Sequence, residues 1–166
     1  MPETHKPRRL VPPLEVELVG GGRWSLAEQR PARFTCVFFY CGQHYPDCGS
    51  YLRQLDGLLD ELARVGVTSV IAASGDDEEH AGRSVRECGL ECLPVGYGQS
   101  VASMREWARF VSRAVKDGEP EPLGEPGFFL VRSDGTLYAA ALITMPLRPS
   151  HPVSPSSLAA RLWGDF

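Results

Sequence analysis

The chain has 166 residues with a formal net charge of -4, which is enough for one domain with its own core and shows no positive excess for nucleic acid. No apolar run approaches the roughly 20 residues that a spanning helix needs, and no secretory signal pattern is present. We therefore expect a cytoplasmic protein that binds neither nucleic acid nor membrane, with its five cysteines as thiols.

The N-terminal part predicts a leader and then a hairpin. Residues 1–13 are rich in proline and basic side chains and poor in apolar ones, so we expect a mobile leader before a single domain over 14–166. Residues 14–18 alternate with a period of two, and three glycines at 20–22 lead into 23–26. This pattern predicts a β-hairpin at the margin of a sheet.

The centre of the chain predicts a strand, a short loop and a helix. Thr35–Tyr40 is a continuous β-branched and aromatic run, typical of a strand buried on both faces. From Cys48 onward apolar residues recur at three and four, which indicates a helix of about 17 residues. Pro46 suits the first helical turn, and Asp47 complements the positive end of the helix dipole. Free backbone N–H groups beside residues 44–48 would favour an anion or a thiolate.

A second strand and a second helix follow. Val67–Ser74 is apolar, and two apolar strands joined by a helix predict a parallel βαβ unit. Ser74 can cap the next helix, with the acidic run 76–79 in its first turn and Gly89 after its end. We interpret the acidic run as a helix start and not as a metal site.

The next helix is expected from about Ser100 to Val115. Leu93–Val95 is long enough for only a minor strand, and residues 96–98 are expected to turn the chain into this helix. Its apolar stripe is interpreted as core and consists of Val101, Met104, Ala108 beside Trp107, Val111 and Val115.

The C-terminal part predicts a long loop, a hairpin and a closing helix. Residues 116–127 form a loop of the length at which loops are often functional. Residues 128–131 and 136–142, joined by a turn at 133–135, predict a β-hairpin. Ser154 and Pro155 suit the start of a last helix. The order of these elements predicts a mixed α/β fold.

Several motifs carry a resemblance to a known family. The chain reads YCGQHYPDC over 40–48 and YLRQLD over 51–56, and further matches are GYG at 96–98, EPGFFLVR at 125–132, DGTLYAA at 134–140 and MP at 145–146. It resembles the peroxiredoxin-like (AhpC/TSA) branch of the thioredoxin-fold superfamily, whose members carry Tyr-Arg-Gly-x-x-Cys-Pro-x-Cys followed by Tyr-Leu-Arg-x-Leu-Asp. The resemblance spans about residues 14 to 150. It implies a thioredoxin-like three-layer sandwich around a mixed β-sheet, with peroxiredoxin-like additions.

The chain departs from this family at two positions of the active turn. Tyr45 stands where the family has its nucleophilic cysteine, and Cys41 stands where it has an arginine. A phenol is a poor nucleophile near neutral pH and forms no sulfenate, which argues against peroxide reduction by the family route. Tyr45 can still donate a hydrogen bond or serve as an acid or base.

Cys48, Cys41 and His44 are the other candidate catalytic residues. Cys48 is either a redox-active thiol at the helix start or a small buried apolar residue. Cys41 precedes it by seven residues, so the two form either a dithiol, if their Cα atoms lie within about 7 Å, or two independent thiols. His44 is either a hydrated loop residue or a proton-transferring and ligand-orienting one.

The expected substrate contacts rest mainly on the resemblance. It implies that Pro126 has a cis peptide bond with Glu125 and abuts the active turn, which leaves a backbone edge open for substrate. We expect Pro46, Tyr97, Glu125 and Pro126 to contact the substrate. Aromatic residues that could line the same mouth or belong to the core are Tyr97, Trp107 and Tyr138.

The remaining cysteines are interpreted as structural. Cys88 and Cys92 lie around a helix end, and two ligands without two more at metal spacing do not make a zinc site. Cys36, inside the central strand, is expected in the core. No metal and no cofactor is expected.

Two functions remain open at this point. The first is a thiol-dependent oxidoreductase-like protein that uses Cys48, with Cys41 as its partner and a thiol reductant or small molecule as substrate. The alternative is a non-redox enzyme of specialised metabolism, or a small-molecule binding protein, that reuses the pocket of His44, Tyr45, Cys48 and Pro126. A homodimer is left open as the assembly.

Overall fold

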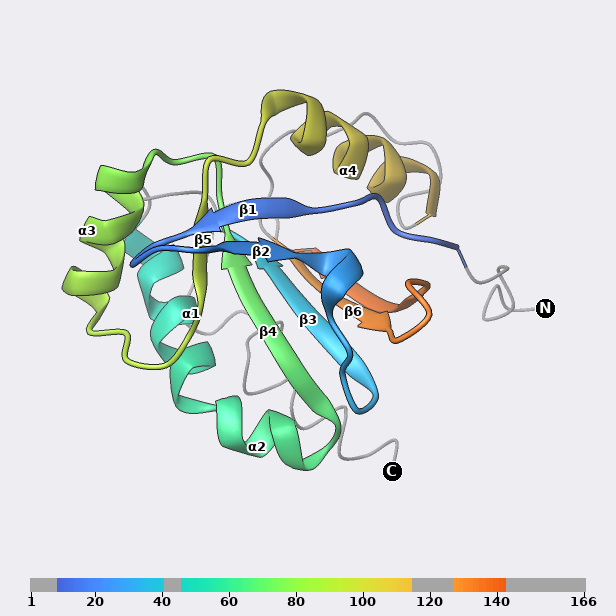
Figure 1. The fold of residues 1–166 in the computed structure, drawn as a ribbon, viewed down its shortest axis with the longest axis horizontal. Coiled ribbons are helices and arrows are strands. Elements are labelled where there is room, and N and C mark those ends of the chain that lie inside the picture. The colour runs from blue at the N-terminus through green and yellow to red at the C-terminus, as the bar shows by residue number, and fades with distance from the viewer. Residues whose placement is uncertain (1–8, 41–45, 115–126, 143–166) are drawn as a thin grey trace.

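The computed structural model describes residues 9–40, 46–114 and 127–142, and within these only the main chain of 46–48, 111–114 and 141–142 (Figure 1). Loop 116–126, the predicted closing helix and residues 1–8 lie outside the described part. The described strands form one seven-stranded sheet in the order β2-β1-β5-β4-β3-β6-β7. Their bounds are β1 (Glu15–Leu18), β2 (Arg23–Ser25), β3 (Phe34–Phe39), β4 (Val67–Ala73), β5 (Val95–Tyr97), β6 (Gly127–Arg132) and β7 (Leu137–Leu142).

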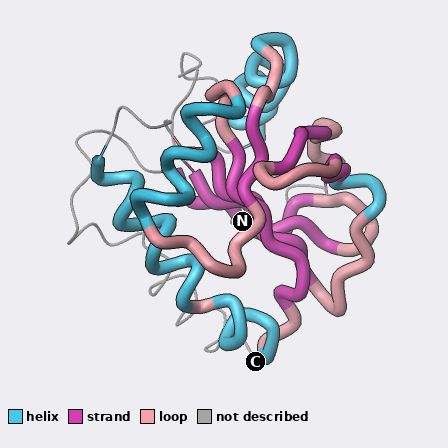
Figure 2. Tube along the Cα trace, turned by 60° about the vertical axis from the view of Figure 1, so that its left-hand side comes forward, coloured by secondary structure: helices cyan, strands magenta, loops and turns pink. Residues whose placement is uncertain are grey.

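The helices lie outside the strands, which pack together in the middle of the molecule (Figure 2). Their bounds are α1 (Pro46–Gly57), α2 (Leu59–Arg64), α3 (Glu78–Cys88) and α4 (Val101–Ala114), and a short 3-10 helix spans Leu26–Glu28. Successive side chains of β3 point to opposite faces of the sheet. Phe38 packs in a cluster with residues of α1, α2 and α3, whereas Val37 packs in a second cluster with Trp107 of α4. These are the three layers that the family resemblance implied.

Strand β3 lies between a parallel and an antiparallel neighbour, as expected for a mixed sheet. It pairs in parallel with β4 and antiparallel with β6, each over all six of its residues. Its first five residues are buried. The parallel pairing confirms the predicted βαβ unit, and the hairpin of β1 with β2 is confirmed at the margin of the sheet.

The single helix predicted after the active turn is divided into α1 and α2. At the break, the Leu58 N–H donates to the Leu55 carbonyl at 3.1 Å, which is three residues back instead of the four of an α-helix. Gly57 precedes the break, and glycine has a low helix propensity. Apolar periodicity continues across this point, which explains why the pattern alone predicted one helix.

The prediction that Ser74 caps α3 is wrong. The N-cap is Asp77, whose carboxylate accepts a hydrogen bond from the His80 N–H at 2.9 Å. The Ser74 hydroxyl oxygen instead accepts from the Asp76 N–H at 3.2 Å within the preceding turn. The acidic run does start the helix, and Gly89 ends it with a left-handed φ of 65°.

Two details of β5 and α4 also differ from prediction. Gly96 and Tyr97 belong to β5 and not to the turn, because β5 pairs with both β4 and β1. Val101 is 52% exposed at the start of α4, whereas Trp107 and Ala108 are buried as expected. The side chains of Val111 and Val115 lie outside the described part.

The end of the predicted leader is hydrogen-bonded to the domain. The Val11 N–H donates to the Gly135 carbonyl at 3.0 Å, and the Leu137 N–H donates to the Arg9 carbonyl at 2.9 Å. The Trp107 indole N–H donates to the Pro13 carbonyl at 3.2 Å. Residues 9–13 therefore lie along the β6–β7 turn and α4.

The carboxylate of Asp56 joins α1 to the loop between α3 and β5. It accepts backbone hydrogen bonds from Leu93 at 2.8 Å, Cys92 at 2.9 Å and Glu91 at 3.3 Å. Partial burial acts to raise the pKa of Asp56, but these hydrogen bonds outweigh it and hold the pKa below its ordinary value.

We predict that Asp56→Ala lowers the free energy of unfolding by about 2 kcal/mol, since the loop N–H groups lose a charged acceptor. Because folding lowers this pKa, the stabilisation is complete above the unfolded value near 3.9 and is lost as the pH falls through the folded value. Urea unfolding at several pH values measures this. Asp60→Ala, an exposed carboxylate on α2, is the control. If Asp56→Ala lowers the free energy of unfolding equally at pH 3 and pH 7, the stabilisation does not come from the charge of Asp56.

Gly96 allows β5 to approach β1 closely. A Cβ at this position would overlap the side chain of Val16, and both residues are buried. We predict that Gly96→Ala destabilises the protein by about 1 to 3 kcal/mol through overpacking, as measured by thermal unfolding. Gly57→Ala is the control, because it meets nothing within 4 Å and should stabilise slightly. If the effects of Val16→Ala and Gly96→Ala on the free energy of unfolding simply add in the double variant, overlap with Val16 is not the cause of the destabilisation.

Candidate active site

The frame of the candidate site is the end of the sheet where β3 stops. Phe39, the last residue of β3, pairs with Gly127, the first residue of β6. The chain therefore leaves β3 and enters β6 at the same end of the sheet. Helix α1 begins at Pro46, so the predicted succession of strand, short connection and helix start is confirmed.

Three aromatic rings hold α1 against this end of the sheet. Phe38 of β3 and Phe128 of β6 are stacked with ring centroids 4.4 Å apart, and Tyr51 of α1 lies 6.4 Å from the first ring and 6.3 Å from the second. All three side chains are 2% exposed or less. Their packing fixes the first turns of α1 relative to the central strands.

Most of the predicted site residues lie outside the described part of the chain. These are Cys41, His44 and Tyr45 in the turn and Glu125 and Pro126 before β6. Pro46 and Cys48 are described as main chain in the first turn of α1. The roles given to all of them from the sequence remain predictions.

A further thiol lies beside the start of α1. Cys88, at the end of α3, packs so closely on the residue after Cys48 that a Cβ at Gly49 would be 3.1 Å from its sulfur. Burial raises the pKa of the Cys88 thiol, and the charge and hydrogen bond of Arg53 only partly offset this. Sequence reasoning assigned Cys88 to packing, because the spacing of residues in α1 and α3 does not reveal which helix faces meet.

Of the other two described cysteines, Cys36 agrees with its expected place in the core, whereas Cys92 is not the packing thiol that the sequence predicted. Cys36 is fully buried, and burial raises the pKa of its thiol to about 12. Cys92 is exposed, and both are free thiols. In the described ranges there is no group of three or more metal-ligating side chains.

The three aromatic residues proposed for the mouth of the site have separate environments. Tyr97 lies on β5, which β4 separates from β3; desolvation raises the pKa of its phenol, and the carboxylates of Glu78 and Glu17 raise it further. Trp107 is core, at 4% exposure. Tyr138 packs on Phe34 with ring centroids 4.5 Å apart. Substrate binding by Tyr97 remains a prediction.

No helix in the described residues has the length and apolar character that crossing a membrane requires. No family model and no curated protein matches the sequence.

Solved structures do match along nearly the whole chain. Peroxidoxin BcpB from Mycobacterium tuberculosis is 18% identical with a TM-score of 0.66, over 95% of this chain and 93% of that one. The Xanthomonas campestris bacterioferritin comigratory protein, described for its alkyl peroxide reduction activity, is 19% identical with a TM-score of 0.63, over 92% and 91%. A thioredoxin-family thiol:disulfide interchange protein from Chlorobium tepidum is 14% identical with a TM-score of 0.67, over 95% and 96%. The chain therefore has the thioredoxin-like fold that is also found in peroxiredoxins.

Proposed function

We propose that the protein is a thiol-dependent oxidoreductase in which Cys48 is the reacting thiol and Cys41 its partner. The observation that carries this proposal is the start of α1 at Pro46, a short connection after the end of the central strand at Phe39. Cys48 belongs to the first turn of that helix, where unpaired backbone N–H groups and the helix dipole favour a thiolate. The likeness of the fold to peroxiredoxins supports the same interpretation.

The proposed reaction uses a peroxide or a disulfide as the oxidant. With a peroxide, the Cys48 thiolate attacks one oxygen, the O–O bond breaks, and Cys48 becomes a sulfenic acid while an alcohol or water leaves. The Cys41 thiolate then attacks the sulfenic sulfur, which forms a disulfide and releases water. A thiol reductant returns both cysteines to the reduced state. Tyr45 and His44 would donate a hydrogen bond and transfer a proton to the leaving oxygen.

Substrate binding in this proposal uses Pro46, Tyr97, Glu125 and Pro126. Glu125 and Pro126 immediately precede Gly127, whose strand partner Phe39 lies two residues before Cys41. This register supports a shared site for the two segments, since both join the sheet at the same end.

We predict that mild peroxide converts the protein to a form that has lost two hydrogens and contains a bridge between Cys41 and Cys48. Intact mass and peptide mapping measure this product. Cys48→Ser should abolish the bridge, and Cys41→Ser should leave Cys48 as a sulfenic acid.

Cys92→Ser is the matched control, because this exposed thiol has no role in the proposal. If Cys48 stays reduced while the control behaves like the native protein, the redox proposal fails. A bridge from Cys48 to Cys88 would retain the redox function and exclude Cys41 as the partner.

A second prediction restores the family pattern. Tyr45→Cys places a thiol before the start of α1, with Cys48 as its resolving partner, and peroxide should be consumed with dithiothreitol as reductant. Adding Cys41→Arg should raise the rate by about tenfold, because an adjacent guanidinium lowers a thiol pKa by at least about one unit.

Cys48→Ser is the reference protein for this assay. Should the folded double variant consume peroxide no faster than this reference, the pocket has changed beyond those two positions. The non-redox alternative, a binding or enzymatic use of the same pocket, would then be the better hypothesis.

A further inference from the structure

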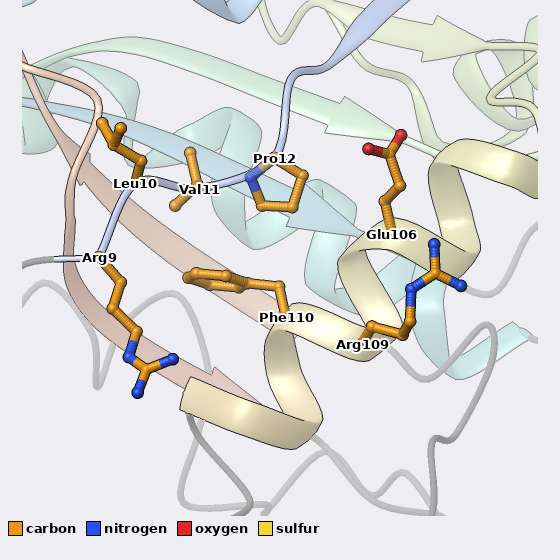
Figure 3. Close-up of a pocket in the computed structure, with 7 residues that line it drawn as sticks. All are labelled: Arg9, Leu10, Val11, Pro12, Glu106, Arg109 and Phe110. Atoms are coloured by element: carbon orange, nitrogen blue, oxygen red, sulfur yellow. The ribbon is translucent and has the colours of Figure 1, made fainter.

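A pocket lies between the N-terminal segment and α4, beside the β6–β7 turn. Its volume is about 450 Å³, which is within the range of small-molecule sites. The described residues that line it are Arg9, Leu10, Val11, Pro12, Glu106, Arg109 and Phe110 (Figure 3). The segment is held in place by the backbone hydrogen bonds of Arg9 and Val11 with the β6–β7 hairpin.

The pocket combines an apolar surface with positive charge. Figure 3 shows the Phe110 ring between Arg9 on one side and Arg109 on the other. Among the described residues, neither guanidinium forms an ion pair, and Glu106 forms none with Arg109 although it lies three residues before it on α4. Among the described lining residues, two arginines and one carboxylate give one excess positive charge on a protein with a net charge of -4.

The apolar surface is firmly supported on one side and uncovered on the other. The Phe110 ring packs edge-on against buried Trp107, with centroids 6.0 Å apart. Trp107 in turn packs against Phe129 at 5.3 Å. Leu10 is 71% exposed, the most exposed large hydrophobic side chain of the described residues. A rigid ring beside uncovered aliphatic groups favours an apolar ligand body, because no ordering of the ring is needed on binding.

We propose that this pocket binds an amphipathic organic carboxylate, whose apolar body lies on Phe110 and Leu10 and whose anionic group binds Arg109. Arg109 is taken as the anchor because it adjoins Phe110 on α4, and a guanidinium binds a carboxylate with two parallel hydrogen bonds. Glu106 opposes this binding by charge repulsion. The proposed binding does not depend on the thiol chemistry proposed for the candidate active site.

Titration calorimetry at low salt with octanoate as the probe tests this assignment. Acetate supplies the charge without the apolar body, and 1-octanol supplies the apolar body without the charge. Octanoate should bind up to about fivefold more tightly than 1-octanol, since an exposed charge interaction contributes up to about 1 kcal/mol, and more tightly than acetate, which lacks the apolar body. Equal binding of octanoate and octanol, or no octanoate binding at millimolar concentration, overturns the proposal.

Variants of α4 test the location of the site, because removing its positive or its negative charge should change octanoate binding in opposite directions. Arg109→Gln should weaken octanoate binding about fivefold, and Glu106→Gln should strengthen it by a few-fold. Phe110→Ala should weaken the binding of both octanoate and 1-octanol. Arg105→Gln is the matched control, since this exposed arginine of the same helix does not line the pocket. If Arg105→Gln weakens binding as much as Arg109→Gln, the effect is one of net charge and the assigned site is wrong.

Discussion

The stacking of Phe38 on Phe128, with Tyr51 packed against both, is the interaction on which the candidate site depends. These rings belong to β3, β6 and α1, which are the three elements that surround the active turn. Because protein interiors are close-packed, a shift of one ring would displace the other two. Buried aromatic packing therefore fixes Tyr51 of α1 relative to the two central strands.

This dependence explains why the motif after the turn is informative about the fold. In the YLRQLD segment, Tyr51, Leu52 and Leu55 are buried, and Asp56 binds three backbone N–H groups of the α3–β5 loop. Arg53 lies against the thiol of Cys88. Each of these residues makes a contact that supports the fold. The sequence of this segment therefore reports on the fold and not on the chemistry of the turn.

The sequence predicted those parts of the fold in which one periodicity dominates. The β3 strand was recognisable from its continuous apolar run, and its pairing with β4 followed from the intervening helix. Errors occurred where two signals compete. Both Ser74 and Asp77 can cap a helix, and only the course of the chain between them decides which one does. Val101 continues the apolar stripe of α4, but it is the first residue of the helix and is exposed, whereas Trp107 and Ala108 are buried.

The contact of Gly96 with Val16 was not predictable, because it joins β5 to β1 across about eighty residues of sequence. The same limit applied to Cys88, whose neighbour Gly49 belongs to another helix. The candidate catalytic residues were found by resemblance of the motif, and the structure adds the frame around them. What the turn does chemically depends on side-chain positions that periodicity does not encode.

The pocket on α4 and the candidate thiols are joined by packed rings. Phe110 contacts Trp107, which contacts Phe39 at 4.9 Å, and Phe39 is the last residue of β3 before the turn. Spatial continuity alone does not couple two sites, because coupling needs an element with two arrangements that both ligands bias. Trp107 is buried and its indole N–H is bound to the Pro13 carbonyl. This packing gives no ground for coupling between the pocket and the turn, so the two proposals stand or fall separately.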